Sequence, residues 1–174
     1  MAGCYQDGSI MIFDRETKYM THSFPKIHQF EAWYTHFRQE KSILYSCSDD
    51  CSFKALDLKS KSLIYSCKKH DAGVTWLKAI SENEVMTCSY DGTVRIWDER
   101  YIKSGSLEQL NFPGKSLWDV NFHLCEETGK LWMGIAAIYD GYLFLSPNKT
   151  DIRHQSLTEH FRALNKMEED NGFS

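Results

Sequence analysis

The sequence has 174 residues, 42% of them hydrophobic and 14% aromatic, so it is long enough for one domain with a sizeable core. The net charge at pH 7 is −4 and like charges do not cluster, which disfavours nucleic acid or an anionic membrane as the main partner. No stretch approaches 18 apolar residues and the first residues lack a signal-peptide pattern, so we expect no membrane span and a cytoplasmic protein. We expect the six cysteines to be small buried side chains in a reducing cytosol.

A unit with an aspartate turn, a short strand and an aromatic–Asp ending recurs along the chain. It reads YQDGSIMIFD at 5–14, SDDCSFKALD at 48–57 and SYDGTVRIWD at 89–98, with a weaker copy, IYDGYLFLSP, at 138–147. The turn aspartates are Asp7, Asp50, Asp91 and Asp140, with spacings of 43, 41 and 49 residues. A period of ~40–45 residues with a Trp-Asp signature is typical of a β-propeller whose blades have four strands.

Strand patterns on both sides of each turn support this interpretation. Runs rich in β-branched and apolar residues precede and follow the Asp turns, and Asp-Gly at 91–92 and 140–141 suits a hairpin between neighbouring strands. We therefore predict an all-β chain, a partial WD-repeat β-propeller of about three to four blades of antiparallel strands, over residues 1–150. The blade segments are expected at 1–22, 28–67, 70–110 and 116–147.

Such an array cannot close a ring, because propellers typically use ~4–8 blades. An open fan of blades exposes strand edges and one apolar face. We expect missing blades or a partner to cover these edges, and the sequence leaves open whether the chain is a fragment or a whole protein.

The tail at 151–174 has a different pattern. Ser156 and Glu159 fit a capping box, and an amphipathic stripe follows at Leu157, Phe161, Leu164 and Met167. We predict a short C-terminal helix, which either packs on the last blade or docks a partner.

Histidines lie at a regular distance before two of the turn aspartates. His70 precedes Asp91 by 21 residues, and His28 precedes Asp50 by 22. We expect His70, Ser89, Asp91 and Trp97 to form a structural hydrogen-bonded network, because a half-satisfied buried Asp–His pair is costly. The second repeat has His28, Ser48 and Asp50 but carries Leu56 in place of the tryptophan.

No familiar catalytic, nucleotide-binding or metal-binding motif is present in the sequence, so we expect no metal and no cofactor. The segment HQFEAW at 28–33 places an imidazole and a carboxylate three residues apart, next to aromatic side chains. At a propeller face, His28 could act as a base and Glu31 could activate water. The alternative is that His28 is a structural histidine of the blade and that the Glu31 side chain is merely exposed to solvent at the entrance of the blade.

These segments together resemble a known family. HQFEAW, then LYSCSDDC at 44–51, HDAGV at 70–74, CSYDGTVRIWDER at 88–100, SLWDVNFH at 116–123 and MGIAAIYDGYLFL at 133–145 are similar in order to the diphthine methyl ester hydrolases, also called diphthine methyltransferases. The resemblance runs from about residue 28 to 145, and HQFEAW with the downstream Asp-Asp turn is its specific part. Asp119 stands where this family carries an arginine.

The resemblance implies hydrolysis of the methyl ester of diphthine on translation elongation factor 2, a step of diphthamide biosynthesis. For such a step we expect His28 and Glu31 as base and orienter, and Trp33 and Trp118 as substrate-binding residues, since methylated ammonium groups favour aromatic faces. Two alternatives remain: a non-catalytic WD-repeat scaffold, such as a ubiquitin-ligase receptor or a trafficking adaptor, and an inactive truncated relative. The W-D-x-R sequence at 97–100 favours the scaffold.

Overall fold

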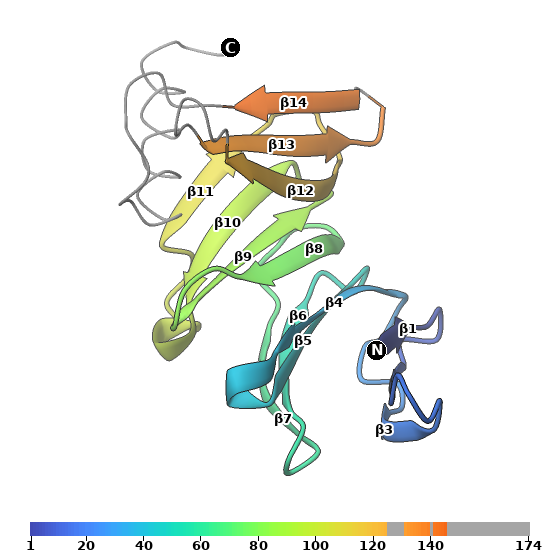
Figure 1. Cartoon of the computed structure of the whole chain (residues 1–174). Coiled ribbons are helices and arrows are strands. Elements are labelled where there is room, and N and C mark those ends of the chain that lie inside the picture. The colour runs from blue at the N-terminus through green and yellow to red at the C-terminus, as the bar shows by residue number, and fades with distance from the viewer. Residues whose placement is uncertain (125–130, 140, 146–174) are drawn as a thin grey trace.

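The protein is described by a computed structural model that covers residues 1–124, 131–139 and 141–145 (Figure 1). These residues form four antiparallel sheets, together with two short 3-10 turns, which agrees with the all-β prediction. The expected helix at 156–167, Cys125 and the turn Asp140 lie outside the described residues. Within the described part, no helix is long and apolar enough to span a membrane.

The sheets follow one another along the chain and fan out in space (Figure 1). The first has β1 (Ala2–Cys4), β2 (Ile10–Phe13) and β3 (Met20–Phe24). The second has β4 (Ala32–Arg38), β5 (Ile43–Ser48), β6 (Phe53–Asp57) and β7 (Ser62–Cys67), with the turn η1 (Gln39–Lys41) after β4. The third has β8 (Val74–Ala79), β9 (Glu84–Ser89), β10 (Thr93–Asp98) and β11 (Glu108–Asn111), with η2 (Glu99–Tyr101) after β10. The fourth has β12 (Leu117–Leu124), β13 (Leu131–Ala137) and β14 (Gly141–Leu145).

The repeated Asp turns are built by local hydrogen bonds. The carboxylate of each turn aspartate accepts the backbone N–H two residues later, which closes an Asx turn. The pairs are Asp7 with Ser9, Asp50 with Ser52 and Asp91 with Thr93. The residue between each pair lies in the left-handed region, with φ of 79° at Gly8 and Gly92 and 62° at Cys51.

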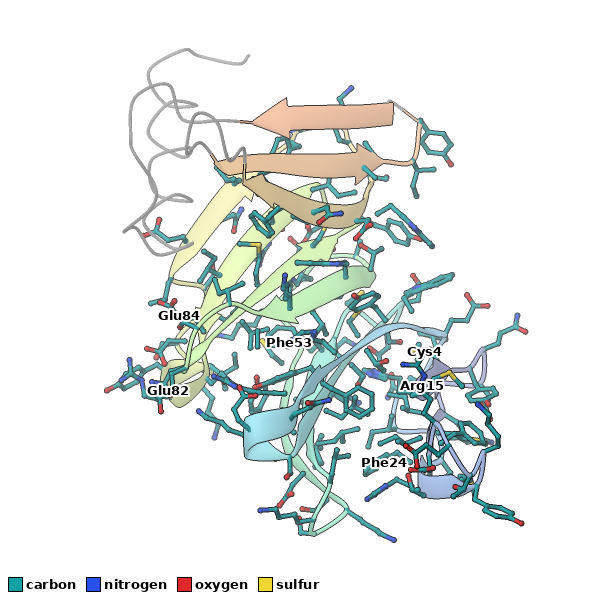
Figure 2. The ribbon with its side chains drawn as sticks, viewed as in Figure 1. Cys4, Arg15, Phe24, Phe53, Glu82 and Glu84 are labelled. Atoms are coloured by element: carbon teal, nitrogen blue, oxygen red, sulfur yellow. The ribbon has the colours of Figure 1, made fainter. Side chains whose placement is uncertain are left out.

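Apolar cores lie between adjacent sheets, because successive strand residues point to opposite faces. Leu44 packs with Ile10 and Phe24 of the first sheet, whereas its neighbour Tyr45 packs in the cluster of Phe53, Val74 and Trp97 towards the third sheet. Figure 2 labels Phe24 and Phe53, which belong to these two separate cores. A third cluster joins residues of β9 and β10 to residues of β12 and β13.

The first strands of the last three sheets, β4, β8 and β12, are called the inner strands here. Each carries a register irregularity near its start. It falls between Ala32 and Tyr34 in β4, between Val74 and Trp76 in β8, and between Leu117 and Asp119 in β12. An extra residue of this kind bends the strand and re-aims its side chain. The residues at these positions are Trp33, Thr75 and Trp118, so the irregularity aims two tryptophans from different sheets.

Candidate functional site at the start of the inner strands

His70 anchors a chain of hydrogen bonds inside the third sheet. Trp97 Nε1 donates to Thr87 Oγ1 at 2.8 Å, and Thr87 Oγ1 lies 2.8 Å from His70 Nε2. His70 Nδ1 lies 2.7 Å from Asp91 Oδ2. Because the indole can only donate and the carboxylate can only accept, protons in this chain all point from Trp97 towards Asp91.

Thr87 takes the bridging place in this chain, and Ser89 does not. Ser89 Oγ accepts the Asp91 amide at 3.1 Å and donates to the Ala72 carbonyl at 3.2 Å, so it supports the turn. Thr87 lies two residues earlier on β9, on the same face of the strand. That period of two is the sequence signal that could have identified Thr87.

The electrostatics of the pair follow from burial and hydrogen bonding. Burial would raise the pKa of the Asp91 carboxyl, but the hydrogen bond and the charge of His70 hold it well below its ordinary value. Burial lowers the pKa of His70. At neutral pH the pair is therefore a neutral imidazole bound to a carboxylate.

His28 occupies the corresponding place in the second sheet. Its Nδ1 lies 3.0 Å from Asp50 Oδ2 and its Nε2 lies 2.8 Å from Ser46 Oγ. The residue is 2% exposed, and Leu56 fills the place that Trp97 has in the third sheet. The two ring nitrogens are thus both engaged inside the sheet, and the geometry does not leave His28 free to act as a base.

Glu31, the expected partner of His28, lies just before β4, and it is half-buried. Its carbonyl accepts the Asp49 amide at 3.0 Å, which places the Glu31 backbone beside the second Asp turn. Since the ring of His28 bonds to Asp50 and Ser46, the two residues do not form a base–orienter pair.

Trp33 and Trp118 meet, although they are 85 residues apart in the sequence. Their ring centroids are 5.3 Å apart with an interplanar angle of 68°, an edge-to-face contact. The centroid of the Tyr90 ring lies 6.0 Å from that of the Trp118 ring. Thr75, the irregular residue of the intervening strand β8, helps to fix this geometry, because its hydroxyl hydrogen-bonds to the Leu117 carbonyl.

Two carboxylates, those of Asp49 and Glu31, lie near Tyr90. Burial raises the pKa of the Tyr90 hydroxyl, and the negative charges of Asp49 and Glu31 raise it further. Gly73 permits this close arrangement, because a Cβ there would meet Asp49 Oδ1 and would lie 3.2 Å from the Tyr90 ring. We name the set of Glu31, Trp33, Asp49, Tyr90 and Trp118 the aromatic–acidic face.

Trp33 Nε1 is buried and has no hydrogen-bond partner among the described residues. Among the described residues, no group of three or more His, Cys, Asp or Glu side chains is placed to hold a metal ion. The five cysteines in that part are free thiols.

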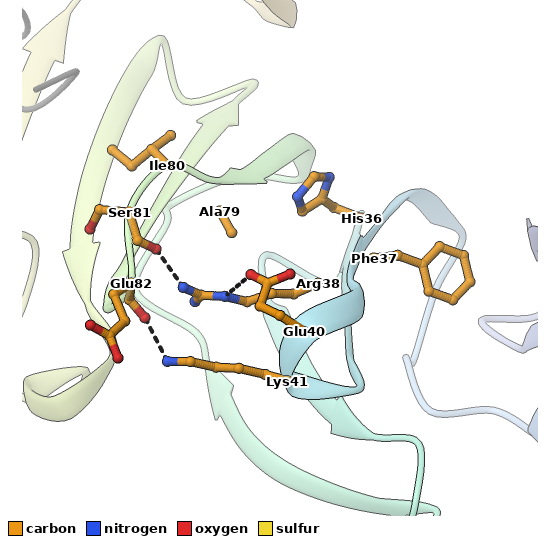
Figure 3. A pocket seen from close by; sticks show the side chains of 9 residues that line it. All are labelled: His36, Phe37, Arg38, Glu40, Lys41, Ala79, Ile80, Ser81 and Glu82. Carbon is orange, nitrogen blue, oxygen red and sulfur yellow. Dashed lines mark hydrogen bonds and ion pairs between the residues drawn. The ribbon is translucent and has the colours of Figure 1, made fainter.

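The opposite ends of the inner strands carry a different environment. A pocket of about 530 Å³ lies between the end of β4 and the loop after β8 (Figure 3). Across it Arg38 donates to the Ser81 carbonyl at 2.7 Å, and Lys41 donates to the Glu82 carbonyl at 2.7 Å. Arg38 also donates to Glu99 at 3.0 Å, so this guanidinium ties the second sheet to the third.

Comparison with known proteins agrees with the repeat pattern. The family model "WD domain, G-beta repeat" matches residues 61–98. The WD40 β-propeller domain of Doa1 superposes with a TM-score of 0.67 at 19% identity, over 86% of this chain and 47% of that domain, which shows the fold. Residues 61–98 match a WD repeat, and the chain has the fold of part of a WD40 β-propeller.

Two curated relatives from Dictyostelium discoideum extend the comparison. A diphthine methyltransferase homolog is 29% identical over 137 residues, 68% of this chain and 37% of the relative. A homolog of WD repeat-containing protein 55 is 30% identical over 74 residues, 42% of this chain and 18% of that relative. The resemblance of this WD-repeat chain to the diphthine methyltransferases is confirmed, and the chain spans less than two fifths of the length of either relative.

Proposed function

We propose that this WD-repeat chain acts in the hydrolysis of the methyl ester of diphthine on translation elongation factor 2, in cytoplasmic diphthamide biosynthesis. The observation that carries the proposal is the contact of Trp33 with Trp118, with the Tyr90 ring next to Trp118 and the charges of Glu31 and Asp49 acting on Tyr90. The similarity to the diphthine methyltransferase homolog supports it. Because the chain spans 37% of that relative, the activity and the protein substrate belong to the proposal.

The two tryptophans would hold the methylated ammonium group of the substrate. A cation over the face of an indole is attracted by the ring quadrupole, by about 0.5–2 kcal/mol depending on how far the site excludes water. Trp118 is 43% exposed and can receive such a group from outside. The carboxylates of Glu31 and Asp49 add an attractive charge on the same side.

Glu31 would serve as the general base. Its carboxylate takes a proton from a water molecule, the oxygen of which attacks the ester carbonyl. The tetrahedral intermediate then breaks its bond to the methoxy oxygen, which leaves with the proton held by Glu31. The products are methanol and a carboxylic acid, which releases its proton to solvent and becomes a carboxylate, and no redox partner is needed. His28 has a positioning role in this proposal, since its bonds to Asp50 and Ser46 hold the start of the segment 28–33.

The test is release of methanol from elongation factor 2 that carries the methylated diphthine ester. We expect Glu31→Gln to lower the rate by ~100-fold or more, a typical contribution of a general base, with an unchanged melting temperature. Glu82→Gln, in the loop after β8, is the matched control and should keep the full rate. His28→Ala should lower the melting temperature, because it removes a buried hydrogen-bonded ring. An equal rate for Glu31→Gln and Glu82→Gln would refute the role of Glu31.

The second candidate is a non-catalytic WD-repeat interaction scaffold, such as a ubiquitin-ligase receptor or a trafficking adaptor. The hydrogen bonds of His28 favour the scaffold, because both ring nitrogens are used to hold the sheet together and neither is left to take part in catalysis. An unchanged ester after incubation with the protein would favour this candidate, or an inactive relative, over the hydrolase.

A further inference from the structure

We propose that the aromatic–acidic face docks an extended, positively charged segment of the partner polypeptide. The proposal takes the location of the site from the proposed function, but docking does not require that the chain hydrolyse an ester. It predicts that basic residues around the modified side chain contribute to selection of the partner.

The first observation is a group of exposed apolar side chains beside the face. Trp118 is 43% exposed, and Ile138 and Tyr139 of the fourth sheet are 44% and 88% exposed. Tyr139 lies close enough to Tyr90 to affect its hydroxyl electrostatically, so the turn after β13 borders the face. Large exposed apolar groups that gather in one place are typical of an interaction surface.

The second observation is the charge around these rings. Asp49 and Glu31 act on Tyr90 on one side, and Asp119, which follows Trp118, acts on Tyr34. Asp49 and Asp119 are exposed. Among the described residues, none of these three carboxylates takes part in an ion pair, whereas Asp50, Asp91, Asp98 and Glu99 all do. Unpaired carboxylates beside exposed aromatic rings are complementary to lysine and arginine side chains.

The third observation is the contrast with the other end of the inner strands. There the pocket of Figure 3 is crossed by Arg38 and Lys41. Arg38 is paired there with the carboxylates of Glu40 and Glu99, so its charge is satisfied within the protein. The carboxylates of Glu31, Asp49 and Asp119 have no such pairing among the described residues, and a basic segment is therefore directed to the aromatic–acidic face.

The experiment uses the full chain and two fluorescein-labelled 12-residue peptides of Gly with either Arg and Lys or Asp and Glu. We expect fluorescence anisotropy to show binding of the basic peptide, weakening as salt rises, and no binding of the acidic one. Asp49→Lys with Asp119→Lys should weaken binding by roughly tenfold or more, because two attractive charges become repulsive. Trp118→Ser should also weaken it, without a change in net charge.

The matched control is Glu16→Lys with Glu82→Lys, which changes the net charge equally at exposed positions on other loops. Figure 2 shows Glu82 on the loop after β8. Equal weakening by the control pair, or equal binding of the acidic peptide, would overturn the proposal. If the lysine pair lowers the melting temperature, Asp49→Asn with Asp119→Asn is used in its place. We expect this pair to weaken binding of the basic peptide by a smaller factor. Unchanged binding would overturn the proposal.

The docking and the hydrolysis fail separately. Glu31→Gln should lose methanol release, whereas it removes only one of the three unpaired carboxylates and should weaken peptide binding less than Asp49→Lys with Asp119→Lys does. If the variants of the face weaken binding of the basic peptide but the protein releases no methanol, docking is supported and the hydrolase proposal is refuted. Methanol release with no binding of the basic peptide would support the hydrolase and remove docking.

Discussion

Replacing Thr87 with valine tests the hydrogen-bonded chain of the third sheet. Thr87 is fully buried, and its single hydroxyl serves both Trp97 Nε1 and His70 Nε2 at 2.8 Å. Valine keeps the shape but strands one buried donor and one buried acceptor. Each stranded group costs about 1–3 kcal/mol, so we expect a loss of roughly 2–6 kcal/mol in the free energy of unfolding. A domain is typically stable by only about 5–15 kcal/mol, so the loss is large.

Two further variants separate the hydroxyl from the volume of the side chain. Thr87→Ser keeps the hydroxyl and removes one methyl group, for a loss of about 1 kcal/mol. Ser46→Ala in the second sheet strands only the ring nitrogen of His28, because Leu56 has no donor there, and should cost about 1–3 kcal/mol. Urea denaturation of the chain, followed by tryptophan fluorescence and circular dichroism, gives the three values. If Thr87→Val is as stable as Thr87→Ser, the hydroxyl does not join the two rings and the reasoning is wrong.

Two other predictions concern the turns and pH. Gly92→Ala should lower the melting temperature more than Gly114→Ala. Both glycines have φ near +75°, but a Cβ at Gly92 would lie 2.7 Å from the Phe112 carbonyl oxygen, whereas one at Gly114 would meet nothing within 4 Å. Equal losses would show that conformation alone matters. Burial lowers the pKa of His70 from 6.5, so the unfolded chain binds its proton first and stability should fall as pH drops through 6.5. The lowered pKa of Asp91 adds a further loss below its ordinary value of 3.8. Urea midpoints measured from pH 7.5 down to about pH 2.5 check both losses. A first decline that is unchanged in His70→Gln would contradict the assignment.

Much of the fold could be predicted from local patterns. The Asp turns recur because an aspartate bonds to the backbone two residues later, and the strands beside them follow from β-rich runs of residues. The distance of 21 residues between His70 and Asp91 was enough to expect that they lie together. These features depend on neighbours in the chain or on one repeat, so a single sequence contains them.

The details of the candidate site could not be predicted as well. The choice between Thr87 and Ser89 depends on which hydroxyl reaches the His70 and Trp97 rings, although both lie on the same face of β9. The burial of His28 and the engagement of both its ring nitrogens could not be read from the sequence, which left open a structural and a catalytic role for this residue. Its neighbours Asp50 and Ser46 are set by the packing of strands within the second sheet.

The sequence by itself determined the repeat, the all-β class and the pairing of His70 with Asp91, because turn chemistry and alternation of side chains act over short stretches of chain. Only the tertiary structure decided that Trp33 meets Trp118 and that Gly73 lets Asp49 approach Tyr90. These contacts join different sheets. They depend on the strand irregularities and on the angle between neighbouring sheets, which packing of the apolar cores sets and which no local pattern of residues encodes.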